Sequence, residues 1–201
     1  MRGKAMKRIC FELESRSINL GNMSALEFFA REGDWQTIAY ANKVKTIEAW
    51  EINPEFKLSL MKNLPGATVR IGDSFERARD SSVKGMFDMI VFDNPQGTFG
   101  KNEQYCEHFE AIETVSALAK KQAIVIFNVN YRPFNFNNLL LWQKRRTQFY
   151  EKKDTGYLSI DFLLSFYEDY FSRKGFQKEF CFAVNRNEEY LSYLVYSLIR
   201  I

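Results

Sequence analysis

The chain has 201 residues, of which 46% are hydrophobic and 26% are charged, a size and balance typical of one globular domain with a sizeable core. Its formal net charge of +3 is too small to mark the whole protein as a nucleic-acid-binding protein. The longest apolar runs, such as residues 123–127, are too short to cross a bilayer, so we do not expect a membrane-spanning protein.

The start of the chain and its cysteines indicate a reducing compartment. Residues 1–8 are basic, but glutamates interrupt residues 9–16, and this does not resemble a secretory signal peptide. Cys10, Cys106 and Cys181 lie far apart, show no zinc-type spacing and cannot all pair within the chain. We therefore expect a soluble cytoplasmic protein with reduced thiols and no metal, and the oligomeric state stays open.

Strand-like and helix-like patterns alternate along most of the chain. Apolar runs predict strands over residues 24–29, 46–52, 67–71, 87–92 and 123–129. Helical patterns favour helices over residues 35–42, 55–63, 74–80 and 105–120. Met89 to Phe92 are continuously apolar, as expected for a strand that is covered on both faces. This alternation is typical of a parallel sheet with helices on both faces.

The end of the chain predicts a different arrangement. A helical pattern covers residues 159–174, and Gly175 can cap that helix. Residues 176–184 and 193–201 read as two strands joined by a turn at residues 185–189. The chain therefore closes with an antiparallel hairpin on an otherwise parallel sheet.

Polar residues follow the predicted strands, at the edge where open parallel sheets bind ligands. After the second strand, Glu51 can accept hydrogen bonds from both hydroxyls of a ribose, and it stands 18 residues after Gly33, close to the roughly 20 of dinucleotide folds. A solvated or helix-capping Glu51 explains the residue about as well. After the third strand, Asp73 can bind an adenine amine, or simply cap the following helix.

The turn Asp93-Asn94-Pro95-Gln96 after the fourth strand is the most specific feature. A buried run ends there in side chains that are rich in hydrogen-bond acceptors and in a rigid proline. Asp93 and Asn94 can hold an amine with its lone pair aimed at an electrophile. A plain turn that ends the strand is the alternative, and we favour a chemical role.

The order of these features resembles class I S-adenosylmethionine-dependent methyltransferases, over roughly residues 23–131 by motif and to the end of the chain through the hairpin. The resemblance implies that the loop 27–33 embraces the methionine part of the cofactor, that Glu51 holds the ribose, and that Asp73 and Ser74 flank the adenine. The residues that it places at the cofactor are Glu27, Phe29, Ala30, Gly33, Glu51, Ile52, Asp73 and Ser74.

The fourth-strand turn is similar to the Asp/Asn/Ser-Pro-Pro-aromatic motif of enzymes that methylate amino groups of bases or of glutamine side chains. It departs from that motif, because Asn94 precedes a single Pro95 and because Gln96 stands where an aromatic residue often stacks on the target base. Asn94 to Gln96 can also be read as the shifted equivalent of the motif. The loop after the first strand is poorer in glycine than is usual for the family.

The expected fold is α/β: a doubly wound, mostly parallel seven-stranded sheet with a C-terminal antiparallel hairpin and helices on both faces. We expect a single Rossmann-like methyltransferase domain over residues 1–201. Residues 1–22 form an N-terminal extension, and residues 132–175 a substrate-side insertion and helix.

The expected activity is methyl transfer from S-adenosylmethionine to an amino nitrogen of a nucleic-acid base, with Asp93, Asn94, Pro95 and Gln96 at the reaction centre. A small-molecule or protein N-methyltransferase and a catalytically degenerate methyltransferase-like binding protein remain alternatives. A nicotinamide-dependent dehydrogenase is disfavoured, because no Gly-x-Gly-x-x-Gly follows the first strand.

Two segments bear on an RNA or DNA substrate. Lys144-Arg145-Arg146 with Phe149-Tyr150 and Lys152-Lys153 combines cations and aromatic rings, which suits nucleic acid, although a solvated helix face explains the charges equally well. Residues 132–137 follow the fifth strand and can line a substrate site. We expect the single histidine, His108, to be structural or solvated rather than a general base.

Overall fold

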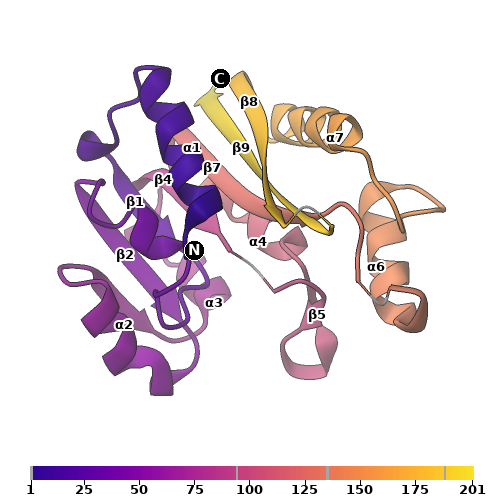
Figure 1. The fold of residues 1–201 in the computed structure, drawn as a ribbon, viewed down its shortest axis with the longest axis horizontal. Coiled ribbons are helices and arrows are strands. Elements are labelled where there is room, and N and C mark those ends of the chain that lie inside the picture. The colour runs from indigo at the N-terminus through magenta and orange to yellow at the C-terminus, as the bar shows by residue number, and fades with distance from the viewer. Residues whose placement is uncertain (1, 94, 135, 188) are drawn as a thin grey trace.

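The structure is a computed structural model that describes residues 2–93, 95–134, 136–187 and 189–201, with the backbone alone for Asn137 and Asn187. Its main sheet has the strand order β3-β2-β1-β4-β7-β9-β8 (Figure 1). The strands are β1 (Ser24–Glu27), β2 (Thr46–Glu51), β3 (Thr68–Ile71), β4 (Phe87–Phe92), β7 (Ala119–Asn130), β8 (Phe176–Asn187) and β9 (Leu191–Arg200).

The strand directions match the predicted fold class. The pairs β1–β2, β1–β4, β2–β3 and β4–β7 are parallel. The last strand, β9, lies antiparallel between β7 and β8. The prediction of a doubly wound, mostly parallel seven-stranded sheet with a C-terminal antiparallel hairpin is therefore confirmed.

Helices cover both faces of the sheet. One face carries α1 (Lys4–Ser15) and α2 (Lys57–Asn63), and the other carries α3 (Ser74–Ala78), α4 (Phe109–Glu113), α5 (Val115–Leu118) and α7 (Ile160–Arg173). Alternate residues of β4 point to opposite faces, so that Met89 and Val91 pack with α1 while Ile90 and Phe92 pack with α4 and α7. This is why β4 needs the unbroken apolar run that the sequence shows.

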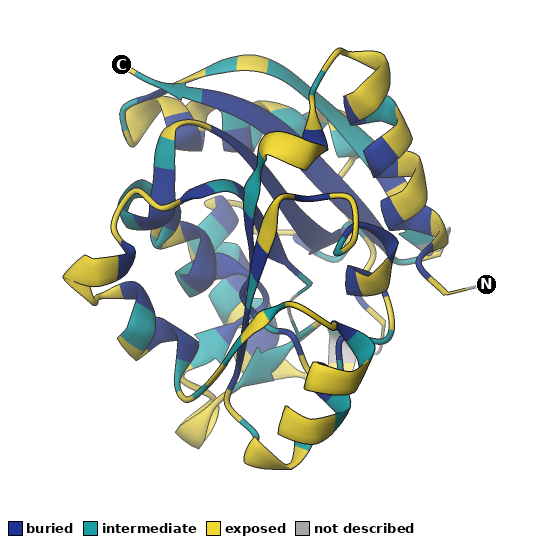
Figure 2. Ribbon diagram, turned by 90° about the vertical axis from the view of Figure 1, so that its left-hand side faces the viewer, coloured by how far each residue is buried: buried dark blue, intermediate teal, exposed yellow. Residues whose placement is uncertain are grey.

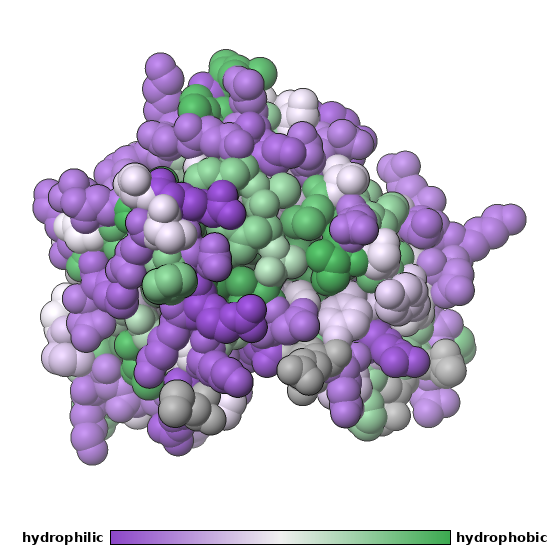
Figure 3. Space-filling view, turned by 45° about the horizontal axis from the view of Figure 1, so that its top comes forward, coloured by the Kyte–Doolittle hydropathy of each residue, from purple (hydrophilic) through white to green (hydrophobic). Residues whose placement is uncertain are grey.

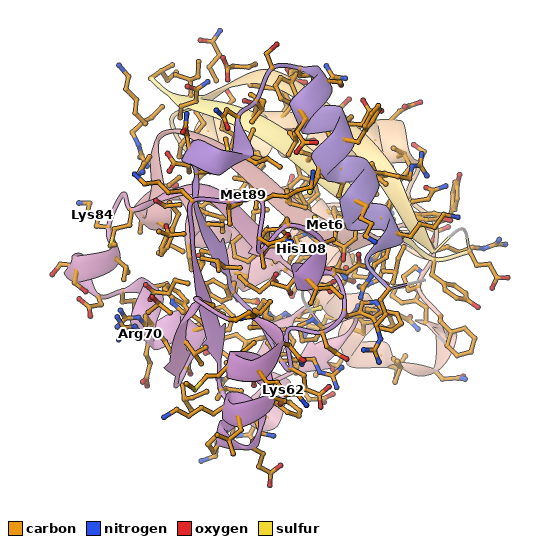
Figure 4. The ribbon with its side chains drawn as sticks, turned by 60° about the vertical axis from the view of Figure 1, so that its left-hand side comes forward. Met6, Lys62, Arg70, Lys84, Met89 and His108 are labelled. Atoms are coloured by element: carbon orange, nitrogen blue, oxygen red, sulfur yellow. The ribbon has the colours of Figure 1, made fainter. Side chains whose placement is uncertain are left out.

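The described part of the expected N-terminal extension, residues 2–22, contributes to this core. Ala5, Met6, Ile9, Cys10 and Leu13 of α1 are buried on the sheet. Figure 4 labels Met6 and Met89, which belong to one buried cluster. In Figure 2 the helix nearest the N-terminus has buried residues on its inner side and exposed residues on its outer side. Helix α1 was not predicted from the sequence.

Two predicted helices are wrong in part. In residues 35–42 the chain forms only the 3-10 turn η2 (Thr37–Ala39), because tertiary hydrogen bonds hold Thr37 and Tyr40 against Glu27. Residues 105–120 divide into strand β6, the short helices α4 and α5, and the start of β7. Strand β6 (Tyr105–Cys106) pairs with β5 (Thr98–Phe99) in a small antiparallel hairpin that the sequence did not suggest.

The remaining helical elements are short turns and α6 (Leu140–Tyr150). The 3-10 turns are η1 (Leu20–Asn22), η3 (Pro54–Phe56), η4 (Ser81–Val83), η5 (Lys101–Glu103) and η6 (Phe136–Asn138). Within the described ranges, no helix combines the length and apolar character that a bilayer crossing requires. On the face shown in Figure 3, hydrophilic side chains surround a central hydrophobic group.

The basic segment after β7 is largely taken up by the fold. Arg146 is fully buried and pairs with the fully buried Glu107 at 2.6 Å. Its guanidinium also donates to the backbone oxygens of Asn130 and Thr155. Arg145 pairs with Glu110. Both interpretations of this segment, a nucleic-acid contact and a solvated helix face, are therefore wrong for the buried Arg146, whereas Lys144 is exposed and Arg145 partly exposed.

Gly33 is required by packing. Its φ is +67°, and a Cβ there would lie 2.8 Å from side-chain carbons of Leu60 and of Leu64 on and beside α2. We expect Gly33→Ala to cost roughly 2–5 kcal/mol of unfolding free energy, from backbone strain and overpacking together. Gly66→Ala is the matched control, since Gly66 also has a positive φ (+89°) but open space at its Cβ. Urea unfolding of both variants checks this, and equal losses would contradict the packing argument.

Candidate functional site

A cavity of about 740 Å³ opens at the carboxyl ends of β1, β2, β3 and β4. Its walls come from the segments that follow these strands, from the β5–β6 hairpin and from one residue of β8. The lining residues are Arg2, residues 28–37, Trp50, Glu51, Ile52, Asp73, Ser74, Phe75, Asp93, Pro95, Gln96, Phe99, Gly100, Tyr105 and Arg186.

Most residues predicted for the site line this cavity. They are Phe29, Ala30, Gly33, Glu51, Ile52, Asp73, Ser74, Asp93, Pro95 and Gln96. Glu27 is fully buried and is not among the lining residues. Asn94 lies outside the described residues. The assignment of cofactor-binding and catalytic roles to these residues stays a prediction.

The Glu51 carboxylate is fixed by the backbone on both sides. One oxygen accepts from the amide of Arg31 at 2.7 Å, and the other accepts from the amide of Asn53 at 2.7 Å. Each carboxylate oxygen can accept a further bond, so Glu51 can still receive two hydroxyl donors on its cavity side. Arg31 adopts a positive φ of +48°, which brings its amide to this carboxylate.

Asp73 and Ser74 have structural partners. Asp73 caps α3, since its carboxylate accepts from the amides of Phe75 at 2.7 Å and Glu76 at 3.3 Å. The Ser74 hydroxyl donates to the backbone oxygen of Phe28 at 2.8 Å. Asp73 therefore has the helix-capping role that was one of its two alternatives. The cap fixes the side chain of Asp73 at the cavity wall, and the bond to Phe28 fixes that of Ser74.

An aromatic wall lines the cavity beside Ser74. Phe75 and Tyr105 stack with ring centroids 4.0 Å apart, and Phe99 packs against Tyr105 at 5.5 Å. Phe29 meets Phe99 edge to face. The β5–β6 hairpin brings Phe99 and Tyr105 to this place, and sequence reasoning missed both because it predicted a helix from Tyr105 onward. Such a wall can hold a planar, apolar ring.

The carboxylate of Asp93 is held by the last two strands. Arg186 of β8 pairs with it through both terminal nitrogens, at 2.8 Å and 3.2 Å, and the Tyr193 hydroxyl of β9 donates to it at 2.8 Å. Burial raises the pKa of Asp93 above its ordinary value, although Arg186, Tyr193 and Arg31 oppose that rise. Asp93 is thus firmly oriented, but most of its acceptor capacity already has a donor from this chain.

Arg186 was missed, although a signal for it existed. It lies near the carboxyl end of β8, a strand that runs in the same direction as β4. Like Glu51 and Asp93, Arg186 stands near the carboxyl end of a strand in the parallel direction, and this position is the signal in the sequence that points to it. Arg2 of the N-terminal segment was also missed, and it lines the cavity while pairing with Asp34 at 2.8 Å.

Glu27 forms a buried polar centre behind the cavity. One of its carboxyl oxygens accepts from Tyr40 at 2.6 Å and from Thr37 at 2.9 Å, and the other is buried without a described hydrogen-bond partner. Burial, followed by the nearby charge of Asp93, raises the pKa of Glu27 to about 8. Glu27 is therefore mainly a neutral acid at pH 7.

This raised pKa predicts how stability changes with pH. The pKa of Glu27 in the folded state, about 8, exceeds its ordinary value of 4.5. The contribution of Glu27 to the free energy of unfolding is therefore fully present below pH 4.5 and is lost as the pH rises through 8. Within the window between these two pH values, the free energy of unfolding of the wild type should fall by about 1.4 kcal/mol for each pH unit because of Glu27. Glu27→Gln, which does not titrate, should lack this fall. Urea unfolding of both proteins across the window measures the difference, and parallel curves would contradict a raised pKa.

His108 lies away from the cavity. It is fully buried, bonds to the Tyr167 hydroxyl, and has a pKa well below its ordinary value because of burial and the charge of Arg146. This fits the structural role expected for it. The described side chains contain no group of three or more His, Cys, Asp and Glu placed to hold a metal ion.

No model of a protein family matches the sequence, and no curated protein matches it. Solved structures do match. TYW2 from M. jannaschii, in complex with AdoMet, is 16% identical with a TM-score of 0.57, over 97% of this chain and 77% of that chain. TYW2 from P. horikoshii, in complex with MeSAdo, is 15% identical with a TM-score of 0.57, over 98% of this chain and 61% of that chain.

A third match is the tRNA m1G37 methyltransferase of M. jannaschii, which is 16% identical with a TM-score of 0.54. It covers 97% of this chain but 48% of that chain, so this chain spans about half its length. At such identities the similarity establishes the fold. Strand order, antiparallel last strand and structural matches together give this chain the fold of the class I S-adenosylmethionine-dependent methyltransferases.

Proposed function

We propose that the protein is an S-adenosylmethionine-dependent methyltransferase that acts on RNA in the cytoplasm and transfers the methyl group to an amino nitrogen of a base. The observation that carries this proposal is one cavity whose lining includes Glu51, Asp73 and Ser74 together with Asp93, Pro95 and Gln96. Two of the matched structures support this proposal: the TYW2 of M. jannaschii is in complex with AdoMet, and the m1G37 enzyme is described as a tRNA methyltransferase.

The residues present fit the proposed cofactor. Glu51 offers a preoriented carboxylate to the ribose hydroxyls, and Ile52 with Phe75 offers apolar contact for the adenine. When bound, the cofactor would supply a methyl group on a cationic sulfur: a nucleophile would bond to the methyl carbon as the carbon–sulfur bond breaks, and the neutral thioether would leave.

The chain's own part in the reaction would be positioning. Asp93 is locked by Arg186 and Tyr193, and the side-chain amide of Asn130 donates to the backbone oxygen of Gln96 at 3.2 Å. These contacts hold both ends of the turn between β4 and β5. Acceptors on Asp93 and Gln96 can hold the hydrogens of a base amine, whose lone pair is otherwise delocalised into the ring, and the proton lost on methylation can pass to solvent. Asn94 is our further candidate for those contacts.

Glu51→Ala provides the test of cofactor binding. We expect calorimetry to show binding of S-adenosylmethionine or its demethylated product to the wild type and a loss of about 10- to 100-fold in the variant, because hydrogen bonds to a charged group are removed. Glu51→Gln keeps one acceptor oxygen and should lose less. Glu55→Ala, a nearby exposed glutamate outside the cavity lining, is the control. Absence of heat with the wild type at millimolar ligand would contradict the proposed function.

A catalytically degenerate, methyltransferase-like binding protein is the second candidate. It is favoured by the ion pair between Arg186 and Asp93, which occupies a carboxylate that the sequence pointed to as an acceptor for the substrate amine. The two candidates share cofactor binding and differ in turnover. A protein that binds S-adenosylmethionine but transfers no methyl group to RNA, DNA, protein or small amines would support this second candidate.

A further inference from the structure

The exposed side of α1 carries three cations. Lys4, Lys7 and Arg8 lie on one side of the helix, since residues three and four apart share a helix face. None of them forms an ion pair with a residue in the described part of the chain. Phe11, one turn further along, is 68% exposed. We call Lys4, Lys7, Arg8 and Phe11 the α1 basic face.

The α1 basic face is hollowed and starts beside the cavity. Its four side chains, with Glu12 at the far end, line an open depression of about 440 Å³. From Lys4 to Phe11 the helix rises about 10 Å. Arg2, directly before the helix, lines the cavity itself. The chain therefore runs from the cavity lining at Arg2, which pairs with Asp34, directly into the α1 basic face.

The order of charges along α1 is unfavourable for the stability of the helix. The first turn contains no acidic residue and the last turn no basic residue, whereas Lys4, Lys7 and Arg8 occupy the N-terminal half and Glu12 and Glu14 the other half. The N-terminus of a helix carries partial positive charge, so cations there destabilise it. These cations therefore do not serve the stability of α1, and their placement points to an external anion.

We propose that the α1 basic face binds the sugar-phosphate backbone and one base of single-stranded RNA whose neighbouring nucleotide enters the cavity. This inference rests on the proposed function and assigns its substrate surface. Lysine and arginine pair with phosphates, and an exposed aromatic ring stacks on a base regardless of sequence. A single strand suits the cavity, because a base within a duplex must leave the stack to enter an enclosed site.

An anionic membrane fits this face less well. Interfacial helices insert an apolar side into the lipid, but the apolar side of α1, with Met6, Ile9 and Leu13, is buried on the sheet. Phe11 is then the one large apolar side chain that the described part of α1 exposes. Continuity with the cavity through Arg2 also favours a molecule that reaches the reaction centre.

The test is charge reversal with a matched control. The first variant combines Lys4→Glu, Lys7→Glu and Arg8→Glu. The control combines Lys45→Glu, Lys84→Glu and Lys121→Glu, three exposed lysines at the amino ends of β2, β4 and β7, opposite the cavity. Lys84 lies far from α1 at the edge of Figure 4. Both variants change the formal net charge from +3 to −3, so they differ only in where the charge lies.

The measurement is binding of a fluorescent single-stranded RNA of about 12 nucleotides, titrated at salt concentrations from about 50 to about 200 mM. We expect the α1 variant to lose about tenfold or more in affinity, with a salt slope shallower by about 2, because three phosphate contacts are lost. The control should stay within about threefold of the wild type. Phe11→Ala should weaken binding without changing the salt slope.

Folding does not confound this test. Glutamates near the N-terminus of a helix are favourable, so the α1 variant should keep or raise its Tm. The neutral variant Lys4→Gln, Lys7→Gln and Arg8→Gln repeats the test with a smaller change in charge. Equal RNA affinity for the α1 variant and the wild type, or equal losses in the α1 variant and the control, would overturn the inference.

Two further arms separate the alternatives. Vesicles that contain phosphatidylserine test the membrane: if the α1 variant loses vesicle binding but keeps RNA binding, the inference is wrong. Calorimetry with S-adenosylmethionine on the same samples tests the proposed function separately. RNA binding that depends on α1 in a protein that binds no cofactor would support the RNA surface and contradict the methyltransferase.

Discussion

Arg146→Met should lower the free energy of unfolding by about 3–5 kcal/mol, which for a chain of this size lowers Tm by on the order of 10 °C. The reason is that the substitution leaves the Glu107 carboxylate fully buried with its cationic partner removed. Trp142 would remain as a donor to Glu107 at 2.7 Å, which is too little to solvate a full charge. Urea unfolding followed by circular dichroism measures the loss.

The partner and a neighbour of Arg146 provide the controls. The double variant Arg146→Met with Glu107→Leu removes both charges and should recover much of the stability, since apolar groups often replace a buried ion pair at little cost. Lys144→Met, on the exposed side of α6, should change stability by less than about 0.5 kcal/mol. A single Arg146→Met variant as stable as the wild type would show that the pair does not anchor α6.

The second large effect concerns Arg186. We expect Arg186→Met to lower methyl transfer by about 100-fold while leaving the affinity for S-adenosylmethionine nearly unchanged, because a loss of about 1 Å in positioning costs this much rate. Arg186 fixes the Asp93 carboxylate through two contacts, and Tyr193 alone would remain. Steady-state kinetics should show the loss in kcat rather than in KM.

A double-variant cycle decides what Asp93 does. If Asp93 acts by positioning the turn with Arg186, Asp93→Ala and Arg186→Met should each slow transfer and the double variant should be little worse than either. If Asp93→Ala abolishes transfer while Arg186→Met leaves it intact, Asp93 contacts the methyl acceptor directly. Tyr193→Phe, which removes one hydrogen bond, should have the smallest effect.

The strands could be predicted because burial on two faces leaves a local record in the sequence. Phe87–Phe92 reads as a strand from composition alone, and the structure has a strand with those ends. Residues 35–42 could not be predicted in this way, because their conformation depends on distant partners: Gln36 accepts from the amide of Met6, and Thr37 binds Glu27. Helix α1 was missed although its buried positions, such as Ala5, Ile9 and Leu13, recur every four residues.

The site residues also divide into those that could be predicted from local sequence and those that depend on the tertiary structure. Glu51 and Asp93 could be predicted from the sequence, because the residues that end parallel strands meet at one edge of the sheet. Arg186 needed the topology of the last two strands, and Tyr105 needed the hairpin that carries it to Phe75. Arg146 shows the opposite failure, since its charge suggested a surface and its burial makes it part of the core.

We propose that methyl transfer from S-adenosylmethionine to RNA takes place in the cavity beside Asp93. The most direct measurement incubates the protein with S-adenosylmethionine that carries a radiolabelled methyl group, together with single-stranded RNA, single-stranded DNA or protein, and counts the label in each. We predict label in RNA with the wild type, strongly reduced label with Arg186→Met, and little label in the other substrates. No label in RNA, under conditions where calorimetry shows that the cofactor is bound, would contradict the claim.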